Sequence, residues 1–157
     1  MKLIPLIDDD NAYLEQFELT EEQLKFVKSP KTNVEVANED NNRTPIFCLN
    51  EEGKPVVFFV LHEHSEYEHA FDVENSIYVR SFATDHRHLR KGYAKQALLA
   101  LPEFIRHHFP HIKYITLLVD VPNTAAKEMY LKLGFIQGKE IKGERYPAYT
   151  MTKSITG

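Results

Sequence analysis

The sequence has little cysteine and no long apolar run. Its 157 residues include one cysteine, Cys48, which has no second cysteine with which to form an internal disulfide. A single cysteine also agrees with a reducing compartment. The longest apolar stretches, 56–61 and 115–119, are far shorter than the roughly 20 residues that a membrane-spanning helix needs. We therefore expect neither a disulfide framework nor a membrane-spanning helix.

An excess of positive charge and a secretory leader are missing as well. The net charge of -4 and the pI near 6.1 argue against a general nucleic-acid binder, because phosphate affinity depends on an excess of Lys and Arg. The first seven residues, MKLIPLI, run directly into three aspartates, which leaves no apolar signal-peptide segment and no small-residue cleavage site. We therefore expect a cytoplasmic protein that binds neither nucleic acid nor a membrane.

Acidic residues are concentrated in the first third of the chain. Residues 1–52 carry twelve Asp and Glu against five Lys and Arg, whereas residues 53–157 carry eleven against fourteen. Such polarity is typical of a solvated face; the alternative is a surface that attracts a cationic small molecule.

Length and composition predict one domain, residues 1–157, with a single buried core. A chain of this size buries roughly 70% of its unfolded surface, enough for stability without disulfides or a structural metal. The hydrophobic patterns predict strands, then an antiparallel hairpin, then alternating strands and helices, which is typical of a layered α/β domain with a mixed sheet. The expected strands are 3–7, 45–49, 56–61, 76–83, 114–119, 135–140 and 146–153, and the expected helical segments are 11–17, 20–27, 94–105 and 125–133.

Local signals refine these expectations at the ends of the helices. Thr20 and Gln23 form a capping-box pattern at a helix start, and Gly134 is expected to end the last helix in a left-handed conformation. Pro102 predicts a kink or a restart within the long helix. Residues 29–42 are polar and predict no element.

Strand 76–83 should present alternate residues to opposite faces of the sheet. Ile77 and Val79 belong to one face, whereas Tyr78, Arg80 and Phe82 belong to the other.

The turn before the long helix is unusually basic for an acidic chain. Residues 86–95 contain four of the nineteen Lys and Arg, and cations at a helix N-terminus are unfavourable by about 0.3 to 1 kcal/mol each unless an anion is bound. The free N–H groups of the first turn, beside the small residues Gly92 and Ala94, would hold a phosphate or diphosphate. The alternative is a basic, solvated loop. The basic residues at the helix start are Arg90, Lys91 and Lys95.

A second helix start follows strand 114–119. Asn123, Ala126 and Tyr130 are spaced three and four residues apart, so they share one helical face. Each also has an ordinary explanation, as an N-cap, a good helix former and an amphipathic core residue respectively.

Together these two stretches resemble the GNAT superfamily of acetyl-coenzyme-A-dependent N-acetyltransferases. The family's loop Gln/Arg-x-x-Gly-x-Gly/Ala corresponds to residues 89–94, with Leu89 at the position of Gln or Arg. Residues 19–27 are similar to the N-terminal helix of the spermidine/spermine-acetylating group. The family's second motif, Asn-x-x-Ala-x-x-x-Tyr followed by Gly-Phe, is matched by Asn123, Ala126, Tyr130, Gly134 and Phe135.

The resemblance implies a GNAT fold whose two central parallel strands, 76–83 and 114–119, splay apart to admit acetyl-coenzyme A as co-substrate. The pantetheine arm would pair with the main chain of one strand, and the diphosphate would bind the N–H groups at the helix start. The implied cofactor-binding residues are Phe82, Ala83, Arg90, Lys91, Gly92, Tyr93, Ala94, Lys95 and Asn123.

The implied reaction moves an acetyl group to a primary amine by direct attack in a ternary complex. Because an alkylammonium has a pKa of about 10.4, a base must remove its proton. Tyr130 would act as the general acid on the leaving thiolate. The base stays open between Tyr78, Glu74, Asp72 and ordered water, and we favour ordered water.

Other functions compete with this one. His62, His64, His69 and His86 suggest a metal site, but no close quartet with ligand spacing appears, so we expect no metal. Cys48 is typical of a small core residue rather than a nucleophile.

Two further expectations concern the amine that accepts the acetyl group and the oligomeric state of the protein. The acidic first third favours a small cationic acceptor, similar to a polyamine, over an antibiotic or a protein N-terminus. The alternative of another class is a non-catalytic sensor of acetyl-coenzyme A. A homodimer is expected only by analogy with the family.

Overall fold

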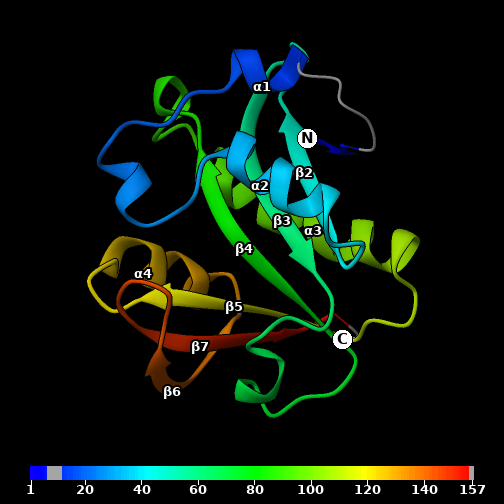
Figure 1. The fold of residues 1–157 in the computed structure, drawn as a ribbon, viewed down its shortest axis with the longest axis vertical. Coiled ribbons are helices and arrows are strands. Elements are labelled where there is room, and N and C mark those ends of the chain that lie inside the picture. The colour runs from blue at the N-terminus through cyan, green and yellow to red at the C-terminus, as the bar shows by residue number, and fades with distance from the viewer. Residues whose placement is uncertain (7–11, 156–157) are drawn as a thin grey trace.

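A seven-stranded mixed sheet forms the centre of the computed structural model, which describes residues 1–6 and 12–155 (Figure 1). The strand order is β1-β2-β3-β4-β5-β7-β6; β4 and β5 are parallel, and each of the other neighbouring pairs is antiparallel. The strands are β1 Lys2–Pro5, β2 Arg43–Leu49, β3 Pro55–His62, β4 Ser76–Thr84, β5 Tyr114–Asp120, β6 Ile136–Lys142 and β7 Pro147–Ser154. The helices are α1 Ala12–Gln16, α2 Pro30–Asn38, α3 Tyr93–His108 and α4 Thr124–Lys132, with short 3-10 helices η1 Gln23–Lys25, η2 Glu68–Ala70 and η3 His86–His88.

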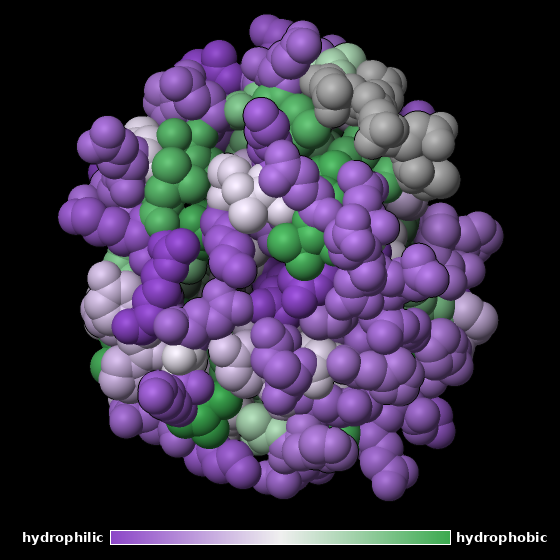
Figure 2. Space-filling view, in the orientation of Figure 1, coloured by the Kyte–Doolittle hydropathy of each residue, from purple (hydrophilic) through white to green (hydrophobic). Residues whose placement is uncertain are grey.

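Helices cover both faces of the sheet. α3 and α4 pack on one face, where they enclose the main apolar cluster, and α2 packs on the other face over β2 and β3. The face seen in Figure 2 is mostly hydrophilic, with hydrophobic residues in separate patches. Within the described residues no helix is long and apolar enough to cross a membrane. The largest members of the main cluster include Phe59, Leu61, Ile77, Leu101, Ile105, Ile115, Leu117 and Met151.

The expected hairpin, parallel strands and mixed sheet are confirmed. β2 and β3 pair through the 50–54 turn, and Gly134 has a φ of 96° after α4. Two of the expected elements reach into residues 7–11, which lie outside the described residues, as does the acidic run 8–10.

The segment 29–42, expected to carry no element, contains helix α2. Ser29 is its N-cap and its side chain accepts a hydrogen bond from the N–H of Thr32 at 3.2 Å, while Pro30 occupies the first helical position. A Ser-Pro pair at a helix start is a recognised signal. The error came from giving the polar composition more weight than this pair.

The capping box at Thr20 and Gln23 is formed, but it starts a much shorter helix than expected. The N–H of Thr20 donates to the side chain of Gln23 at 2.9 Å, and the N–H of Gln23 donates to the Thr20 hydroxyl at 3.2 Å. Only the 3-10 helix η1 follows. The Gln23 side chain also donates to the carbonyl of Thr84 at 2.7 Å and so ties this segment to β4.

Two details of the expected elements differ in the structure. Of the kink or restart expected at Pro102, the restart does not occur, because α3 runs through this residue. Phe82 lies on the same face as Ile77 and Val79, not on the expected opposite face, and its ring stacks on that of Phe59 with 5.6 Å between the centroids. The cause is a bulge in β4, where Ser81 has a φ of 55°. The bulge inserts one residue and reverses the alternation beyond it.

Candidate active site

The two parallel strands separate halfway along their length. β4 pairs with β5 from Ser76 opposite Tyr114 to Val79 opposite Leu117, and the pairing ends there. β4 continues to pair with β3 on its other side as far as Thr84. The edge of β4 that faces β5 therefore has no strand partner beyond Val79, and Figure 1 shows the resulting V between the strands.

One cleft occupies the α3 and α4 side of this opening. It has a volume of about 250 Å³. Its lining combines the end of β4 with one face of α4, so the residues expected from the two helix starts come together here. They are Gln23, Phe26, Val27, Phe82, Ala83, Thr84, Leu89, Ala94, Asn123, Ala126, Met129 and Tyr130.

The start of α3 presents free main-chain donors beside this cleft. Gly92 is the N-cap with a φ of 81°, and the N–H of Gln96 donates to its carbonyl at 3.0 Å. The N–H groups of residues 93–95 therefore have no acceptor within the helix. A Cβ built on Gly92 would meet no atom within 4 Å, so a ligand can approach the main chain there. Arg90, with a φ of 63°, precedes this turn and is exposed.

A buried carboxylate holds the loop that leads to α3. Asp85 accepts hydrogen bonds at 2.8 Å from the N–H groups of Glu18 and Arg87, and it also pairs with the Arg87 guanidinium at 2.7 Å. Burial works against the charge of Asp85, but the Arg87 side chain and the main-chain donors outweigh it and lower the pKa of this carboxyl. The loop is therefore fixed by hydrogen bonds at its first residue.

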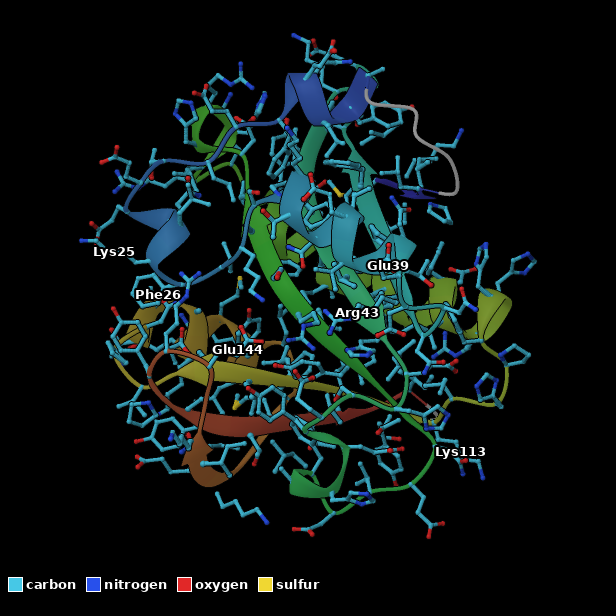
Figure 3. All side chains as sticks on the ribbon, viewed as in Figure 1. Lys25, Phe26, Glu39, Arg43, Lys113 and Glu144 are labelled. Atoms are coloured by element: carbon cyan, nitrogen blue, oxygen red, sulfur yellow. The ribbon has the colours of Figure 1, made fainter. Side chains whose placement is uncertain are left out.

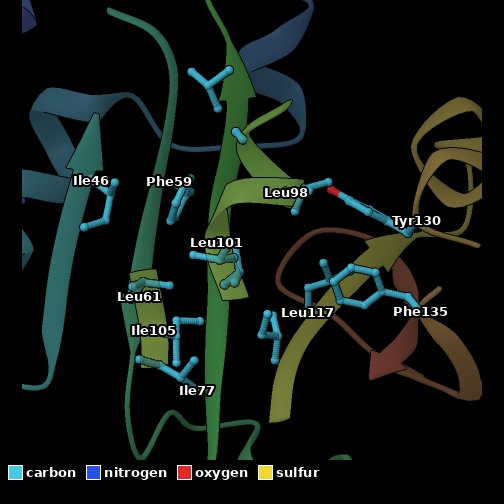
Figure 4. Packing of buried hydrophobic residues seen from close by; sticks show 14 of the residues in the cluster. Ile46, Phe59, Leu61, Ile77, Leu98, Leu101, Ile105, Leu117, Tyr130 and Phe135 are labelled. Carbon is cyan, nitrogen blue, oxygen red and sulfur yellow. The ribbon is translucent and has the colours of Figure 1, made fainter. Parts of the chain in front are cut away.

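The face of α4 brings Asn123 and Tyr130 to the cleft. The Asn123 side chain accepts from the N–H of Ala126 at 3.3 Å, so it also has the ordinary capping role. Tyr130 is buried, its ring centroid lies 5.7 Å from that of Phe135 in an edge-on contact, and its hydroxyl points away from α4 toward Leu98 of α3 in the view of Figure 4. Burial raises the pKa of Tyr130, and the negative charge of Asp120 raises it further.

A second cavity lies on the opposite side of the sheet, at the same opening. Its volume is about 80 Å³, and a smaller space of about 60 Å³ connects its lining to Tyr130. Phe26, Val27, Leu118 and Asp120 line both spaces. The other residues of the larger cavity are Lys28, Tyr67, Tyr78, Arg80, Ser81, Gly143, Glu144 and Arg145.

Arg80 organises the charges of this second cavity. Its buried guanidinium donates to Glu66 at 2.6 Å and to Glu144, and its Nη1 lies 3.0 Å from Nδ1 of His62. Burial opposes ionisation of Glu66, but Arg80 lowers the pKa of this carboxyl. Both glutamates are therefore held as partners of one buried cation.

The segment around η1 and the β6–β7 loop meet over the cavity. Phe26 stacks on Tyr146 at 5.4 Å, and Arg145 donates to the carbonyl of Leu24. Figure 3 shows Phe26 and Glu144 beside each other where β4 and β5 diverge, and both line the cavity.

The expected bases are poorly placed. Tyr78 is buried in the second cavity, and burial raises its pKa, so its phenol holds its proton firmly. Asp72 and Glu74 line none of the three spaces at the opening, and Asp72 instead lies 3.9 Å from Lys139. The carboxylates present are Asp120 and Glu144, which the sequence analysis missed. Asp120 carried a signal, because it directly follows an apolar strand.

The acidic first third does not supply the charge of the site. Its described residues at the opening are Gln23, Phe26, Val27 and Lys28, none of which is a carboxylate. The expected attraction of a cation by the first third is therefore not supported, because its described acidic side chains line none of these spaces.

The histidines and the cysteine have other surroundings. His62 contacts Arg80, His64 lies 3.3 Å from Glu68, and His86 lies 3.1 Å from Glu18. Among the described residues no three His, Cys, Asp or Glu are grouped to hold a metal. Cys48 is buried in the core, and burial raises the pKa of its thiol, so a thiolate nucleophile is disfavoured.

Comparisons with known proteins agree with this geometry. The profile of the Acetyltransferase (GNAT) family matches residues 9–135. The uncharacterized N-acetyltransferase YbbJ of Bacillus subtilis (strain 168) is 34% identical over 133 residues, which cover 84% of this chain and 80% of that protein.

Two solved structures share the fold at low sequence identity. Spermidine N-acetyltransferase from Vibrio cholerae, in complex with CoA and spermine, is similar with a TM-score of 0.73 and 16% identity, covering 99% of this chain and 95% of that one. The aminoglycoside acetyltransferase AAC(6')-Ib in complex with coenzyme A has a TM-score of 0.75 and 16% identity, covering 97% and 93%. The chain therefore belongs to the GNAT family and is an N-acetyltransferase with acetyl-coenzyme A as its co-substrate.

Proposed function

We propose that this chain transfers the acetyl group to a primary amine of a small, cationic, polyamine-like acceptor by direct attack in a ternary complex. The observation that carries the proposal is a pair of spaces, a cleft beside the start of α3 and a cavity beside Asp120 and Glu144, with a smaller space between them that shares Tyr130 with the cleft and Asp120 with the cavity. Two reactants entering from opposite faces of a sheet would meet at the opening between β4 and β5.

The chain's own groups fit acetyl-coenzyme A on the α3 side. The free N–H groups of residues 93–95 suit the diphosphate, and the exposed Lys91 and Lys95 add positive charge. The unpaired edge of β4 at Phe82 and Ala83 suits an extended pantetheine arm, which can pair as an added strand does.

Two side chains beside these main-chain groups differ in what they offer the cofactor. Asn123 lines the same cleft and would contact the pantetheine arm. Leu89 has no polar group to offer, so the side-chain contact that a Gln or Arg would make at this position is missing, and the main-chain donors are unaffected.

Tyr130 is suited to protonate the leaving group. Acetyl-coenzyme A supplies a thioester whose carbonyl carbon the amine attacks, and the expelled thiolate has a reference pKa of about 8.5. Because the pKa of Tyr130 is raised, its hydroxyl keeps its proton at neutral pH until sulfur leaves. We therefore assign Tyr130 as the general acid.

The acceptor side favours an amine with positive charge. Asp120 lines the cavity together with the aromatic rings of Phe26 and Tyr67, and a carboxylate and aromatic faces both attract an ammonium group. Lys28, Arg80 and Arg145 line the same cavity, but the charge of Arg80 is balanced by Glu66 and Glu144. The similar protein from Vibrio cholerae is a spermidine acetyltransferase, which agrees with this choice.

A panel of amines tests the proposal. Release of free thiol from acetyl-coenzyme A would be measured with spermidine, spermine, an aminoglycoside, and a peptide with a free N-terminus. We expect the polyamines to give the highest kcat/KM. A flat response to every amine, with binding of coenzyme A retained in calorimetry, would contradict an enzymatic role, and a preference for the peptide would contradict the acceptor class.

A further inference from the structure

We propose that Asp120 is the general base that removes the proton from the acceptor amine. This inference rests on the proposed function. The reaction requires a base, and the sequence motifs do not identify it.

Asp120 is placed between the acceptor cavity and the smaller space that Tyr130 lines. It is the last residue of β5, it lies three residues beyond the last pairing with β4, and it pairs with Ala148 on the β7 side. Its side chain therefore belongs to the part of the sheet where β5 has left β4. Of the four residues that line both the larger acceptor cavity and the space containing Tyr130, Asp120 alone is ionisable.

The other carboxylates near the cavity are already engaged. Arg80 binds Glu66 through both guanidinium nitrogens, at 2.6 and 3.3 Å, and it also binds Glu144. A carboxylate held by a buried guanidinium is a poor proton acceptor, because protonation breaks a charge-assisted pair.

Asp120, by contrast, has both carboxylate oxygens available. Within residues 1–6 and 12–155 its side chain makes no hydrogen bond or ion pair, and the residue is partly buried. Burial raises the pKa of Asp120 and Glu144 raises it further, while Arg145 acts in the opposite direction. A more basic carboxylate takes a proton from an ammonium more readily.

Charged and titratable groups face Asp120 from every neighbouring element. From β4 and the loop at η2 they are Tyr78, Arg80 and Tyr67; from the β6–β7 loop, Glu144 and Arg145; from the segment after η1, Lys28; and from α4, Tyr130.

The protons balance with Asp120 and Tyr130 in separate roles. The ammonium gives one proton to Asp120, and the neutral nitrogen then bonds to the carbonyl carbon as the carbon–sulfur bond breaks. Sulfur leaves with the bonding electron pair and takes the proton of the Tyr130 hydroxyl. The second proton from nitrogen restores Tyr130 through solvent, and Asp120 releases its proton to solvent, so each turnover yields one amide, one thiol and one proton.

The pH dependence of Asp120→Asn tests the assignment, with Asp120→Glu as the variant that keeps a carboxylate. In wild type, kcat/KM should fall at acid pH, because only ionised Asp120 accepts the proton. The pKa of this acid limb should lie above the ordinary pKa range of an aspartate. In Asp120→Asn we expect kcat at pH 7 to fall by on the order of 10²-fold, a typical contribution of general base catalysis. The remaining rate should rise about tenfold per pH unit, because it depends on free amine.

Two further readouts separate catalysis from folding. The Kd of coenzyme A and the thermal midpoint of Asp120→Asn should stay close to wild type, and Asp120→Glu should recover part of kcat together with an acid limb. Glu144→Gln should keep the acid limb and change mainly the KM of the amine. If wild type is active and Asp120→Asn has the same pH profile, the assignment of Asp120 is overturned and the proposed function stands. Equal losses of kcat in Asp120→Asn and Asp120→Glu would have the same meaning. A wild type that acetylates no amine would overturn the proposed function with it.

Discussion

Tyr130 and Asp120 are both groups whose protonation is set by partial removal from water. Burial raises the pKa of each. The Tyr130 phenol therefore stays protonated at neutral pH, and the Asp120 carboxylate becomes a stronger base. Their negative forms also disfavour one another, because Asp120 raises the pKa of Tyr130. The charge of Asp120 therefore helps to keep the phenol neutral, which is the form that a general acid needs before it gives up its proton.

Replacing Tyr130 by Phe removes the hydroxyl and keeps the ring that packs on Phe135. We expect kcat to fall by on the order of 10²-fold, as is usual for loss of a general acid, with the Kd of acetyl-coenzyme A changed less than about threefold. Steady-state kinetics and calorimetry measure the two quantities. Equal loss in both would count against the acid role.

Asp85 contributes stability rather than chemistry. Because it is fully buried and accepts charge-assisted hydrogen bonds, we expect Asp85→Asn to lower the free energy of unfolding at pH 7 by about 2 kcal/mol. The folded pKa of Asp85 lies below its unfolded value, so this contribution is present above the unfolded pKa of about 3.9 and is lost as the pH falls through the folded pKa.

Denaturant unfolding at several pH values measures this difference. The exposed Asp72, replaced by Asn, is a matched control and should change stability by less than about 0.5 kcal/mol. A difference between wild type and Asp85→Asn that grows toward acid pH would contradict the prediction.

Among individual residues, the motifs predicted the α4 face and missed the residues of the cavity that we propose for the acceptor. Asn123, Ala126 and Tyr130 lie within eight residues, so helical spacing alone brings them together. Asp120 ends β5 and Glu144 lies in the β6–β7 loop, and the pairing of β5 with β7 brings them to one cavity, which no local pattern encodes.

At the scale of elements, the start of α3 depends on the left-handed conformation of Gly92. A side chain at such a position costs roughly 1 kcal/mol of backbone strain. In Gly92→Ala the backbone would shift, and the N–H groups of residues 93–95 would move with it. Losing one charge-assisted hydrogen bond of about 1.5 kcal/mol would raise the Kd of coenzyme A about tenfold.

Gly53 offers a matched control for this prediction. Its φ of 77° is close to that of Gly92, and neither position has an atom within 4 Å of an added Cβ. Gly53→Ala should lose similar stability and leave the Kd of coenzyme A unchanged. If both variants bind coenzyme A as tightly as wild type, the turn is not the anion site.

The elements themselves were mostly predictable, because most strands have a clear apolar pattern; the exception is β6, which is mostly polar and exposed. The face of Phe82 was not, since a bulge at Ser81 reverses it, and bulges depend on pairing with a neighbour. Helix α2 was missed because its polar surface hides the pattern, although Ser29 and Pro30 marked its start.

At the scale of the whole molecule, segments distant in sequence close the opening between β4 and β5. Phe26 lines all three spaces and stacks on Tyr146 of the β6–β7 loop. The N-terminal segment and the C-terminal hairpin therefore meet over the spaces in which we propose that both reactants bind.

Replacing Phe26 by Ala should weaken the binding of both reactants. A lost aromatic pair of about 1 kcal/mol predicts roughly fivefold increases in the KM of the amine and the Kd of coenzyme A. Kinetics and calorimetry measure the two values, and an effect on neither would show that Phe26 does not contribute to binding.

A homodimer stays a prediction from the family resemblance. Light scattering of the purified chain at several concentrations tests it, with a mass of twice 18.3 kDa as the expected result and a monomer mass as the contradicting one.

A crystal structure with coenzyme A bound tests the central claim most directly. We expect the diphosphate within hydrogen-bond distance of the N–H groups of residues 93–95 and the pantetheine arm between β4 and β5, with its sulfur directed toward Tyr130. A structure that shows the turn at Gly92 empty and the nucleotide bound elsewhere would contradict the account.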